Sequence, residues 1–362
     1  MKTVCLLEHK ENNPRNSEGA FIRLADGRIL CAYTRYFGKE GHDHSTANIA
    51  GVISSDDGKT WTDAGILIPK DEGAMNLMSV SLLRLQDGRI AMVYVRKSQT
   101  PDGGYADCRP WIIFSSDEAK TWSEPVSVAG QIPSVYIVVN NDRLIQLKSG
   151  RLVIPAAWYR WQKQGINDQG IAVFFLSDDG GATWRESRQC CYPPNRLGAG
   201  LAEPGVIELA DGILMAWART NGGCQYKMFS FDQGESWTEA QGAREFLSPE
   251  SPLSMKRNPK DGFLYAVWNC WDPKFSVRMK AASWGRTPLV IARSTDEGKS
   301  WTDFTVLENE PDHGYCYIAM LFRNDELLLE YCCGGGKNSF VLQDAKIAVV
   351  DLAKLNSGYP ED

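Results

Sequence analysis

The sequence predicts an all-β fold, a six-bladed β-propeller of four-stranded antiparallel blades. Two series of short patterns repeat in phase along the 362 residues: five copies of a turn of the form Ser-x-Asp-x-Gly-x-Thr/Ser-Trp, and six hairpin turns. A regular period is the mark of a repeat architecture. We therefore expect one domain over residues 1–362, although the length alone would suggest two domains.

The five turns begin at residues 54, 115, 177, 230 and 294, which are 61, 62, 53 and 64 residues apart. Each turn follows an apolar run and so lies where a strand ends. In such a turn, Ser and Asp oxygens accept backbone N–H groups, Gly supplies a positive φ, and Trp buries a large ring beneath the loop. Only the second copy, SSDEAKTW, departs from the pattern, because Ala119 stands at the Gly position.

The hairpin turns interrupt apolar segments, and most of them have the Asp-Gly pair that is the strongest short-range signal for a hairpin. They are Asp26-Gly27, Asp87-Gly88, Ser149-Gly150, Asp211-Gly212, Asp261-Gly262 and Asn324-Asp325. The last unit lacks the Ser/Asp/Trp turn, and its third strand is expected over Lys346 to Leu352. The N-terminal segment from Thr3 to Leu7 is expected to complete that sheet and close the ring, which would leave only short, protected edges.

Composition excludes several classes of partner. The net charge of −6 argues against nonspecific nucleic-acid binding, for which a basic face is expected. No apolar run approaches the roughly 18 residues of a membrane span. The ten cysteines form no CxxC pair, which favours reduced, buried thiols. The N-terminal residues do not resemble a signal peptide. We therefore expect a cytoplasmic protein, or a secreted or periplasmic one if a leader was removed.

The two series together resemble the Asp-box (BNR-repeat) propellers of the sialidase, or neuraminidase, superfamily over nearly the whole chain. Four segments are similar to family motifs in the same order: DRLIQLKSGRLVIPAAW, LAEPGVIELADGILMAWART, WGRTPLVIARSTDEGKSW and DHGYCYIAMLFRNDELLLEY. The resemblance implies a retaining exo-glycosidase that cleaves a terminal acidic sugar from a glycan or glycoconjugate. It places the catalytic glutamate at Glu203, two substrate-binding arginines at Arg219 and Arg286, and the nucleophile at Tyr315.

Sialidase chemistry explains this choice of residues. A sialic acid carries a carboxylate on its anomeric carbon, so a carboxylate nucleophile would be repelled and a neutral tyrosine would not. A tyrosine with an ordinary pKa of about 10 needs a base within hydrogen-bond reach, and Glu203 is the candidate. Arg219 and Arg286 would hold the substrate carboxylate through bidentate guanidinium contacts.

The acid/base residue is expected in the loop before the first Asp box, which reads YFGKEGHDHSTANIAGVISSDDG. The resemblance implies an aspartate there, and Asp43 fits. His42 and His44 flank it, and either histidine could transfer a proton with less tuning of its pKa. All three residues stay candidates for the acid/base role, with the histidines also candidates for substrate contacts.

The sequence departs from the family at its first arginine, which normally precedes the first hairpin. Counting back from that hairpin puts Ser17 or Glu18 at this position, and Arg15 lies two residues away as a possible replacement. If Glu18 faces the site, it would set a carboxylate beside the substrate carboxylate, which is unfavourable. This departure weakens the expectation of sialic acid more than that of a glycosidase.

Two further residues are candidate substrate contacts. His313 lies in a loop of the last blade, where His42-x-His44 could join it in a cluster; a metal site there is one reading, but polar substrate contacts or surface groups are favoured. Arg143 could bind a sugar hydroxyl or pair with Asp142. No metal and no cofactor are expected.

Three function classes remain open: an exo-sialidase, a related propeller glycosidase or lyase that acts on a uronate or deoxysugar with help from histidine, and a noncatalytic glycan-binding propeller. The missing first arginine favours the second class. The third class would not need Glu203, Arg219 and Tyr315 together.

Overall fold

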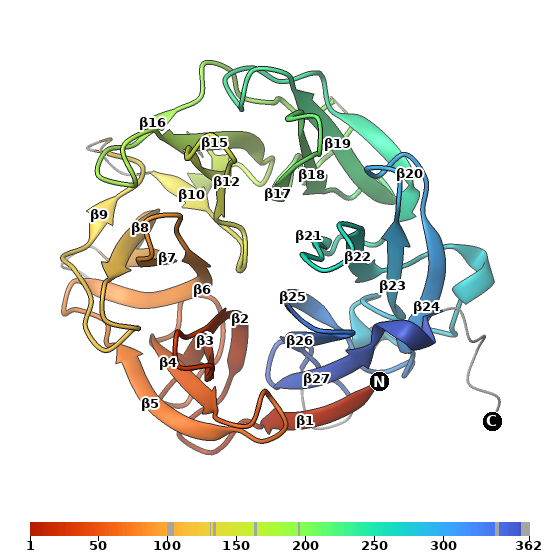
Figure 1. Cartoon of the computed structure of the whole chain (residues 1–362), viewed down its shortest axis with the longest axis horizontal. Coiled ribbons are helices and arrows are strands. Elements are labelled where there is room, and N and C mark those ends of the chain that lie inside the picture. Colours follow the sequence, from red (N-terminus) through yellow and green to blue (C-terminus); the bar gives the residue numbers. More distant parts are fainter. Residues whose placement is uncertain are drawn as a thin grey trace.

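The computed structural model describes residues 1–99, 105–130, 132, 135–162, 165–194, 196–336 and 340–355. Their strands form one ring of six blades, each an antiparallel sheet of four main strands, around a central axis (Figure 1). The predicted six-bladed propeller is confirmed. Short parallel bridges between neighbours, such as Ala47 with Asn76, link the first three blades along one continuous path.

The blades follow one another along the chain. The first blade contains β2 (Asn16–Arg23), β3 (Ile29–Tyr36), β4 (Ala47–Ser54) and β5 (Thr62–Ile68). The second contains β6 (Ala74–Arg84), β7 (Ile90–Gln99), β8 (Tyr105–Ser115) and β9 (Val126–Ser127). The third contains β10 (Tyr136–Val138), β11 (Ile145–Gln146), β12 (Leu152–Tyr159), β15 (Ile171–Ser177) and β16 (Arg185–Glu186). The next two contain β17 (Ala202–Glu208), β18 (Leu214–Arg219), β19 (Cys224–Ser230) and β20 (Gln241–Leu247); and β21 (Ser254–Arg257), β22 (Leu264–Asn269), β23 (Leu289–Ser294) and β24 (Thr302–Glu308).

The sixth blade is closed by the N-terminal strand, as the sequence predicts. It contains β25 (Cys316–Arg323), β26 (Glu326–Cys332), β27 (Ala345–Asp351) and β1 (Lys2–Leu7), in the sheet order β1-β27-β26-β25. The antiparallel pairing of β1 with β27 joins the two ends of the chain in one sheet (Figure 1). Closure of this kind covers the edge of β27 and leaves β1 as the outer edge strand of the blade.

The hydrophobic core lies between the blades. Six clusters of buried apolar side chains among the described residues each join two neighbouring blades, for example Val93 with Ile154 at the second seam and Tyr265 with Leu329 at the fifth. Because both faces of a blade are covered by its neighbours, the middle strands are buried along nearly their whole length, and β15 is buried at every position.

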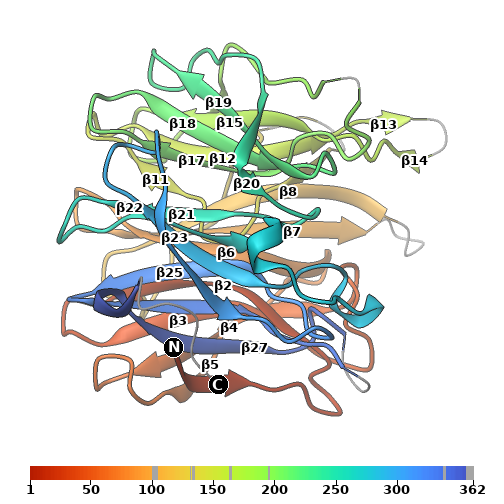
Figure 2. The ribbon, with the colours of Figure 1, turned by 90° about the vertical axis from the view of Figure 1, so that its right-hand side faces the viewer.

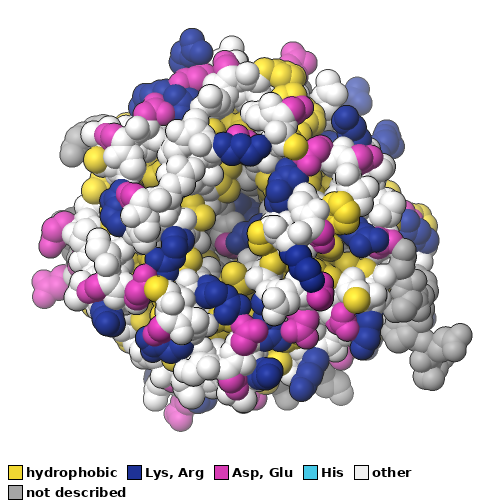
Figure 3. Space-filling view, in the orientation of Figure 1, with side chains coloured by type: hydrophobic (Ala, Val, Ile, Leu, Met, Phe, Trp, Pro, Cys, Tyr) yellow, Lys and Arg dark blue, Asp and Glu magenta, His cyan; other side chains and the backbone are white. Residues whose placement is uncertain are grey.

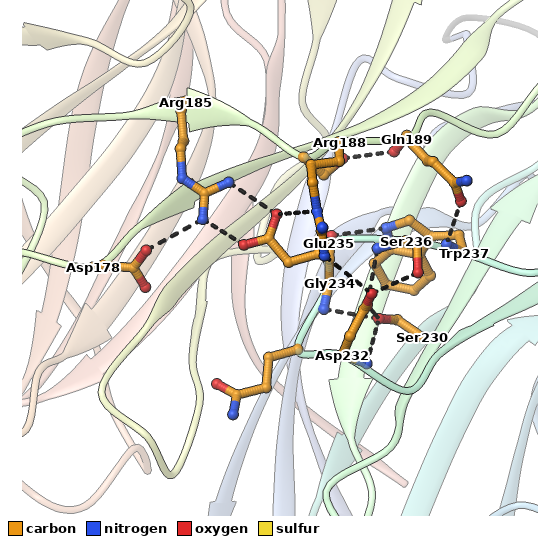
Figure 4. Close-up of polar contacts among 12 residues, drawn as sticks. Asp178, Arg185, Arg188, Gln189, Ser230, Asp232, Gly234, Glu235, Ser236 and Trp237 are labelled. Carbon is orange, nitrogen blue, oxygen red and sulfur yellow. Dashed lines mark hydrogen bonds and ion pairs between the residues drawn. The ribbon is translucent and has the colours of Figure 1, made fainter.

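Each Asp box is a hydrogen-bonded turn, shown for the fourth blade in Figure 4. Ser230 Oγ accepts the N–H of Gly234 at 2.8 Å, and Asp232 accepts both the N–H of Ser236 at 2.8 Å and its hydroxyl at 2.6 Å. Trp237 stacks on Phe174 of the preceding blade with 3.8 Å between ring centroids. The polar groups of the box thus form hydrogen bonds with one another, and its tryptophan packs against the neighbouring blade.

Antiparallel pairing sorts the loops onto two faces. The hairpin turn lies at one end of each blade, together with the Asp box in the first five blades, and the loop between the second and third strands lies at the other end. Figure 2 shows a two-stranded hairpin, β13 (Trp161–Gln162) with β14 (Gly165–Ile166), projecting from the ring. On the face seen in Figure 3, positive and negative side chains are interspersed.

Among the residues that the structure describes, helical structure is limited to three short 3₁₀ turns, η1 (Pro273–Phe275), η2 (Ala281–Ser283) and η3 (Leu352–Lys354). The first two lie in the long loop between β22 and β23. Within the described part of the chain, no helix has the length and apolar character needed to cross a membrane. The ten cysteines are all free thiols, and seven of them are buried.

Candidate active site

A cavity of about 1280 Å³ opens at the end of the blades opposite the Asp boxes. All six blades contribute to its wall. The charged and phenolic side chains that line it are Arg15, Glu18, Glu40, His42, Asp43, His44, Lys97, Tyr136, Tyr159, Asp168, Glu203, Arg219, Glu250, Arg286 and Tyr317. Acidic and basic groups therefore converge at one place in a ring that is otherwise packed with apolar side chains.

β-Bulges on the innermost strands direct four of the side chains that line the cavity. Glu18, Ser79, Glu203 and Tyr317 have φ values of 59°, 60°, 45° and 61°. The pairing register shifts at each of these places, for example between Ala202 and Gly205. A bulge bends the strand and re-aims a side chain, and a positive φ at a non-glycine residue costs about 1–3 kcal/mol. A bulge with a strained residue thus recurs in four blades, and in each blade the side chain of that residue lines the cavity.

Tyr317 and Glu203 form the central pair of the cavity. The Tyr317 hydroxyl donates to Glu203 Oε1 at 3.1 Å across the ring, from the sixth blade to the fourth. Burial and the nearby Glu203 carboxylate raise the pKa of Tyr317 well above its ordinary value. Because the phenol is held neutral, it can act as a nucleophile only if a base takes its proton, and Glu203 already accepts that hydrogen bond.

The structure corrects the expectation for Tyr315. Its side chain is 1% exposed and packs in the seam between the fifth and sixth blades, where its ring meets that of Tyr331 at 6.2 Å between centroids. It does not line the cavity. The reason is the bulge between Cys316 and Ala319, which turns Tyr317 inward and leaves Tyr315 facing the neighbouring blade.

Arg219 and Arg286 lie in the cavity, as the resemblance implies. Arg219 donates from Nη1 to Glu203 Oε2 at 2.8 Å and from Nη2 to Glu250 Oε1 at 3.0 Å. Arg286 donates from Nη1 to the Cys316 sulfur at 3.0 Å, and its guanidinium lies 5.5 Å from the centre of the Tyr317 ring. Two cations therefore flank the Tyr317–Glu203 pair.

Arg15 supplies a third guanidinium, which corrects the expectation that the first arginine is missing. It is 1% exposed, lines the cavity, and donates to Glu18 Oε1 at 2.8 Å and to Asp43 Oδ1 at 2.6 Å. The bulge at Glu18 adds one residue to β2 before the hairpin, which accounts for one residue of the two between Ser17 and Arg15. Glu18 does face the cavity, where it pairs with Arg15 and accepts the Ser79 hydroxyl at 2.5 Å.

Asp43 lies at the cavity wall beside Arg15. Burial alone would raise its pKa, but the Arg15 guanidinium and the Lys97 ammonium outweigh that effect and lower the pKa of Asp43 to about 2. Burial raises the pKa of Glu18 in spite of its pairing with Arg15. The two carboxyl groups on either side of Arg15 are thus pushed in opposite directions, a pattern found where acid and base roles are divided.

The histidines do not form one cluster. His42 and His44 line the cavity, where His42 Nε2 contacts Glu40 Oε2 at 3.0 Å and burial and Lys97 lower the pKa of His44. His313 instead contacts Asp312 at 2.9 Å and is not among the described residues that line the cavity. No group of three His, Cys, Asp or Glu side chains within the described ranges is arranged to hold a metal ion.

Arg143 is a structural residue, which overturns its assignment to substrate binding. It is buried away from the cavity, where it donates to Leu253 O at 2.8 Å and to Ser254 Oγ at 3.2 Å. Burial lowers its pKa to about 10. The contacts tie the third blade to the fifth across the ring.

Sequence reasoning missed Tyr317, Ser79, Lys97 and Glu250 as cavity residues. The sequence does carry a signal for Ser79, because Glu18, Ser79 and Glu203 each lie nine residues before the glycine of the following hairpin, at 27, 88 and 212. No comparable sequence signal marks Lys97 or Glu250.

A model of the BNR repeat-like domain matches residues 27–329, most of the chain. The chain belongs to the BNR repeat-like family. Curated relatives of this BNR repeat-like protein include a Bacteroides fragilis sialidase, 32% identical over 205 residues that cover 52% of this chain and 35% of the relative. A Clostridium perfringens sialidase is 26% identical over 256 residues, which cover 64% of each chain. The chain therefore spans less than two thirds of the length of these relatives.

Solved structures give the same fold for this BNR repeat-like protein. The Ruminococcus gnavus intramolecular trans-sialidase, solved in complex with oseltamivir carboxylate, matches with a TM-score of 0.72 at 14% identity and covers 99% of this chain and 98% of that one. A protein of unknown function from Dyadobacter fermentans also has a TM-score of 0.72, at 19% identity, with 95% of this chain and 98% of that chain covered. At these identities the likeness concerns the fold alone.

Proposed function

We propose that the protein is a retaining exo-glycosidase that removes a terminal sialic-acid-type sugar from a glycan or glycoconjugate. The observation that carries the proposal is the hydrogen bond from Tyr317 to Glu203 in a cavity that also holds Arg15, Arg219 and Arg286. A phenol paired with a carboxylate, beside several guanidinium groups, suits a substrate that carries its own carboxylate at the reacting carbon.

Substrate binding begins with the arginines. Their planar donors fit a carboxylate in bidentate fashion and would fix the anomeric carbon near Tyr317. These guanidinium groups are held by protein groups, including Asp43 and Glu18 at Arg15, and Glu203 and Glu250 at Arg219. The substrate carboxylate would therefore compete with protein carboxylates for the same donors.

The first chemical step transfers the sugar to the enzyme. Tyr317 Oη attacks the anomeric carbon while Glu203 accepts the phenolic proton, and the bond to the leaving oxygen breaks as protonated Asp43 gives that oxygen a proton. Before the substrate binds, Asp43 is ionised because Arg15 and Lys97 lower its pKa to about 2. When the substrate carboxylate takes over Arg15, Asp43 loses part of that positive charge and its pKa rises.

The second step reverses these roles. Water attacks the anomeric carbon of the sugar–tyrosine intermediate, Asp43 accepts a proton from the water, and Glu203 returns the proton to the departing Tyr317 oxygen. Two displacements at one carbon retain its configuration. Asp43 is favoured over His42 for the acid/base role because Arg15 couples it directly to the carboxylate site, at 2.6 Å.

Arg15 also bears on the choice of sugar. A missing first arginine would favour a uronate or deoxysugar, but a buried guanidinium in the cavity supplies the third cation. The test is a release assay with 4-nitrophenyl sialoside, glucuronide and rhamnoside, in which NMR identifies the first anomer released. We expect turnover of the sialoside with retention. Turnover of only the uronide or rhamnoside, or inversion, would contradict the proposal, and binding of a sialoside without any release would favour the noncatalytic class.

A further inference from the structure

The loop that carries Asp43 is held from beneath by two side chains of the second blade. It joins β3, which ends at Tyr36, to β4, which begins at Ala47, and much of it is exposed. Asn76 on β6 and Lys97 on β7 are directly opposed partners in the antiparallel register. They therefore present an amide and an ammonium group side by side on one face of the blade.

Both groups bind backbone carbonyls of the loop. Asn76 Nδ2 donates to the carbonyl oxygens of Asp43 at 3.0 Å and of Ser45 at 2.9 Å. Lys97 Nζ donates to the same Asp43 oxygen at 2.8 Å. Asn76 is fully buried and Lys97 is 3% exposed, although Lys97 lines the cavity. Buried hydrogen bonds of this kind are costly to break, because the carbonyl is left without a partner.

We propose that Asn76 and Lys97 are positioning residues, which hold the backbone of Asp43 so that its carboxyl group reaches the oxygen of the leaving group. This inference rests on the proposed function, because it assigns Asp43 the acid/base role. The two donors bind the main chain of Asp43 and leave its carboxylate to Arg15. The side chain can then move from Arg15 towards the leaving oxygen while its Cα stays in place.

The role makes a prediction that a general loss of stability does not. A proton from Asp43 is needed when the leaving group is a poor one, such as the galactose hydroxyl of a sialyl-galactoside. It is hardly needed for 4-nitrophenolate, which departs as an anion. Asp43 also acts in the second step, which both substrates share, so the comparison uses kcat/KM, which reports only the first step. We expect Asn76→Ala and Lys97→Met each to lower kcat/KM on the sialyl-galactoside by about 10- to 100-fold, within the range attributed to general acid catalysis. On the 4-nitrophenyl sialoside, kcat/KM should change by less than about threefold.

Arg96→Met is the matched control. Arg96 is the neighbour of Lys97 on β7, but it pairs with the exposed Asp71 and makes no contact with the loop. We expect it to leave the ratio of the two kcat/KM values unchanged. An equal loss on both substrates for the Asn76 and Lys97 variants, or no loss on either, would overturn the proposal. If Asn76→Ala does not fold, Lys97→Met alone decides the result.

A structural readout separates this inference from the proposed function. Lys39 lies exposed in the same loop, so trypsin cleavage after Lys39 reports how firmly the loop is held. Trypsin should cleave Asn76→Ala and Lys97→Met there at least about fivefold faster than the wild type and the Arg96→Met control, because local opening of the loop sets the rate of cleavage. Unchanged cleavage would contradict the anchoring even if the protein turns over no sialoside, an outcome that would by itself refute only the proposed function.

Discussion

Both faces of the propeller contain non-glycine residues with a positive φ, and the two faces differ in what these residues do. The second Asp-box turn has a non-glycine residue, Ala119, with φ 63°, and the inner strands of the cavity face have Glu203 and Tyr317 with φ 45° and 61°. On the Asp-box face the residue types recur and satisfy one another, as in the bonds among Ser230, Asp232 and Ser236. On the cavity face, the bulges in four blades carry no constant residue type: the residues are Glu18, Ser79, Glu203 and Tyr317. Repetition thus builds the ring, and departures from repetition supply the chemistry.

The largest effect is expected from the two tyrosines that the bulge separates. Tyr317→Phe removes the oxygen that would attack the sugar, so turnover of a sialoside should fall on the order of 10³-fold or more. Tyr315→Phe changes a ring packed in the seam between blades and should leave kcat within about twofold and stability within about 1 kcal/mol. Steady-state kinetics and melting temperatures of both variants check this. A larger loss of activity in Tyr315→Phe would reverse the assignment.

The arginines of the cavity should affect binding. Arg219→Ala and Arg286→Ala should each weaken an acidic sugar or a carboxylate-bearing transition-state mimic by about 2–5 kcal/mol, because the ligand carboxylate would be left partly unpaired in a desolvated site. Arg143→Ala is the contrast on the same kind of residue, since its guanidinium binds only Leu253 and Ser254 in the buried interior. It should lower the melting temperature and leave the inhibition constant of the folded protein unchanged. Inhibition constants that move equally in all three variants would refute the distinction.

The next largest effect is expected from the buried carboxyl group of Glu330, through the pH dependence of stability. Burial raises the pKa of Glu330 to about 8, although its Oε2 accepts the Gly19 N–H at 3.0 Å. An unfolded chain releases this proton near pH 4.3, so the folded state binds more protons between about pH 4 and 8, and stability should fall as the pH rises through that range. Glu330→Gln keeps an acceptor for Gly19 and removes the titration.

The measurement is the difference in unfolding free energy between wild type and Glu330→Gln at pH 5 and pH 8. The wild type should lose on the order of 1 kcal/mol or more relative to the variant over this interval. A difference that does not depend on pH would show that Glu330 does not titrate in the fold. No such pH dependence is expected from the Asp-box aspartates between pH 5 and 8, because hydrogen bonds from the side chains and backbone of the turn lower the pKa of Asp117 and Asp296 to about 2.

The smallest effect lies on the Asp-box face. Ala119 occupies the position that is glycine in the other four boxes, and its N–H still bonds Ser115 Oγ at 2.9 Å. Ala119→Gly should raise the unfolding free energy by about 1 kcal/mol, because it relieves an alanine held at positive φ. Gly234→Ala, at φ 90°, should have the opposite sign. Denaturant titration measures both, and kcat should be unchanged in each.

The sequence predicts the periodic parts of this molecule well. The turns at Asp26-Gly27 and at Asn324-Asp325, the Asp boxes and the closing strand near Thr3 to Leu7 all lie where local patterns indicate them. These features depend on short-range chemistry, namely glycine at a tight turn and alternation along a strand. Glu203, Arg219 and Asp43 also lie in the cavity, since their motifs lie near strand ends.

The error at Tyr315 has its physical origin in the pairing register. Residues two apart on a regular strand point the same way, so a pattern with Tyr315 and Tyr317 cannot show which ring faces the cavity. The extra residue of a bulge decides it, and a bulge is a long-range property of the pairing register. The bulge at Glu18 likewise adds one residue to β2 and so accounts for part of the offset between Ser17 and Arg15. Arg143, in the loop between β10 and β11, was misplaced because the sequence does not show that this loop is buried in the ring.

The central claim, that Tyr317 is the nucleophile, is tested most directly by trapping the covalent intermediate. A sialosyl fluoride with a second fluorine beside the anomeric carbon forms the sugar–enzyme bond faster than that bond is hydrolysed. Peptide mapping by mass spectrometry then locates the sugar. We predict one sugar on Tyr317, and no adduct in Tyr317→Phe. A sugar attached to Tyr315, or an inactivated enzyme with no tyrosine modified, would contradict it.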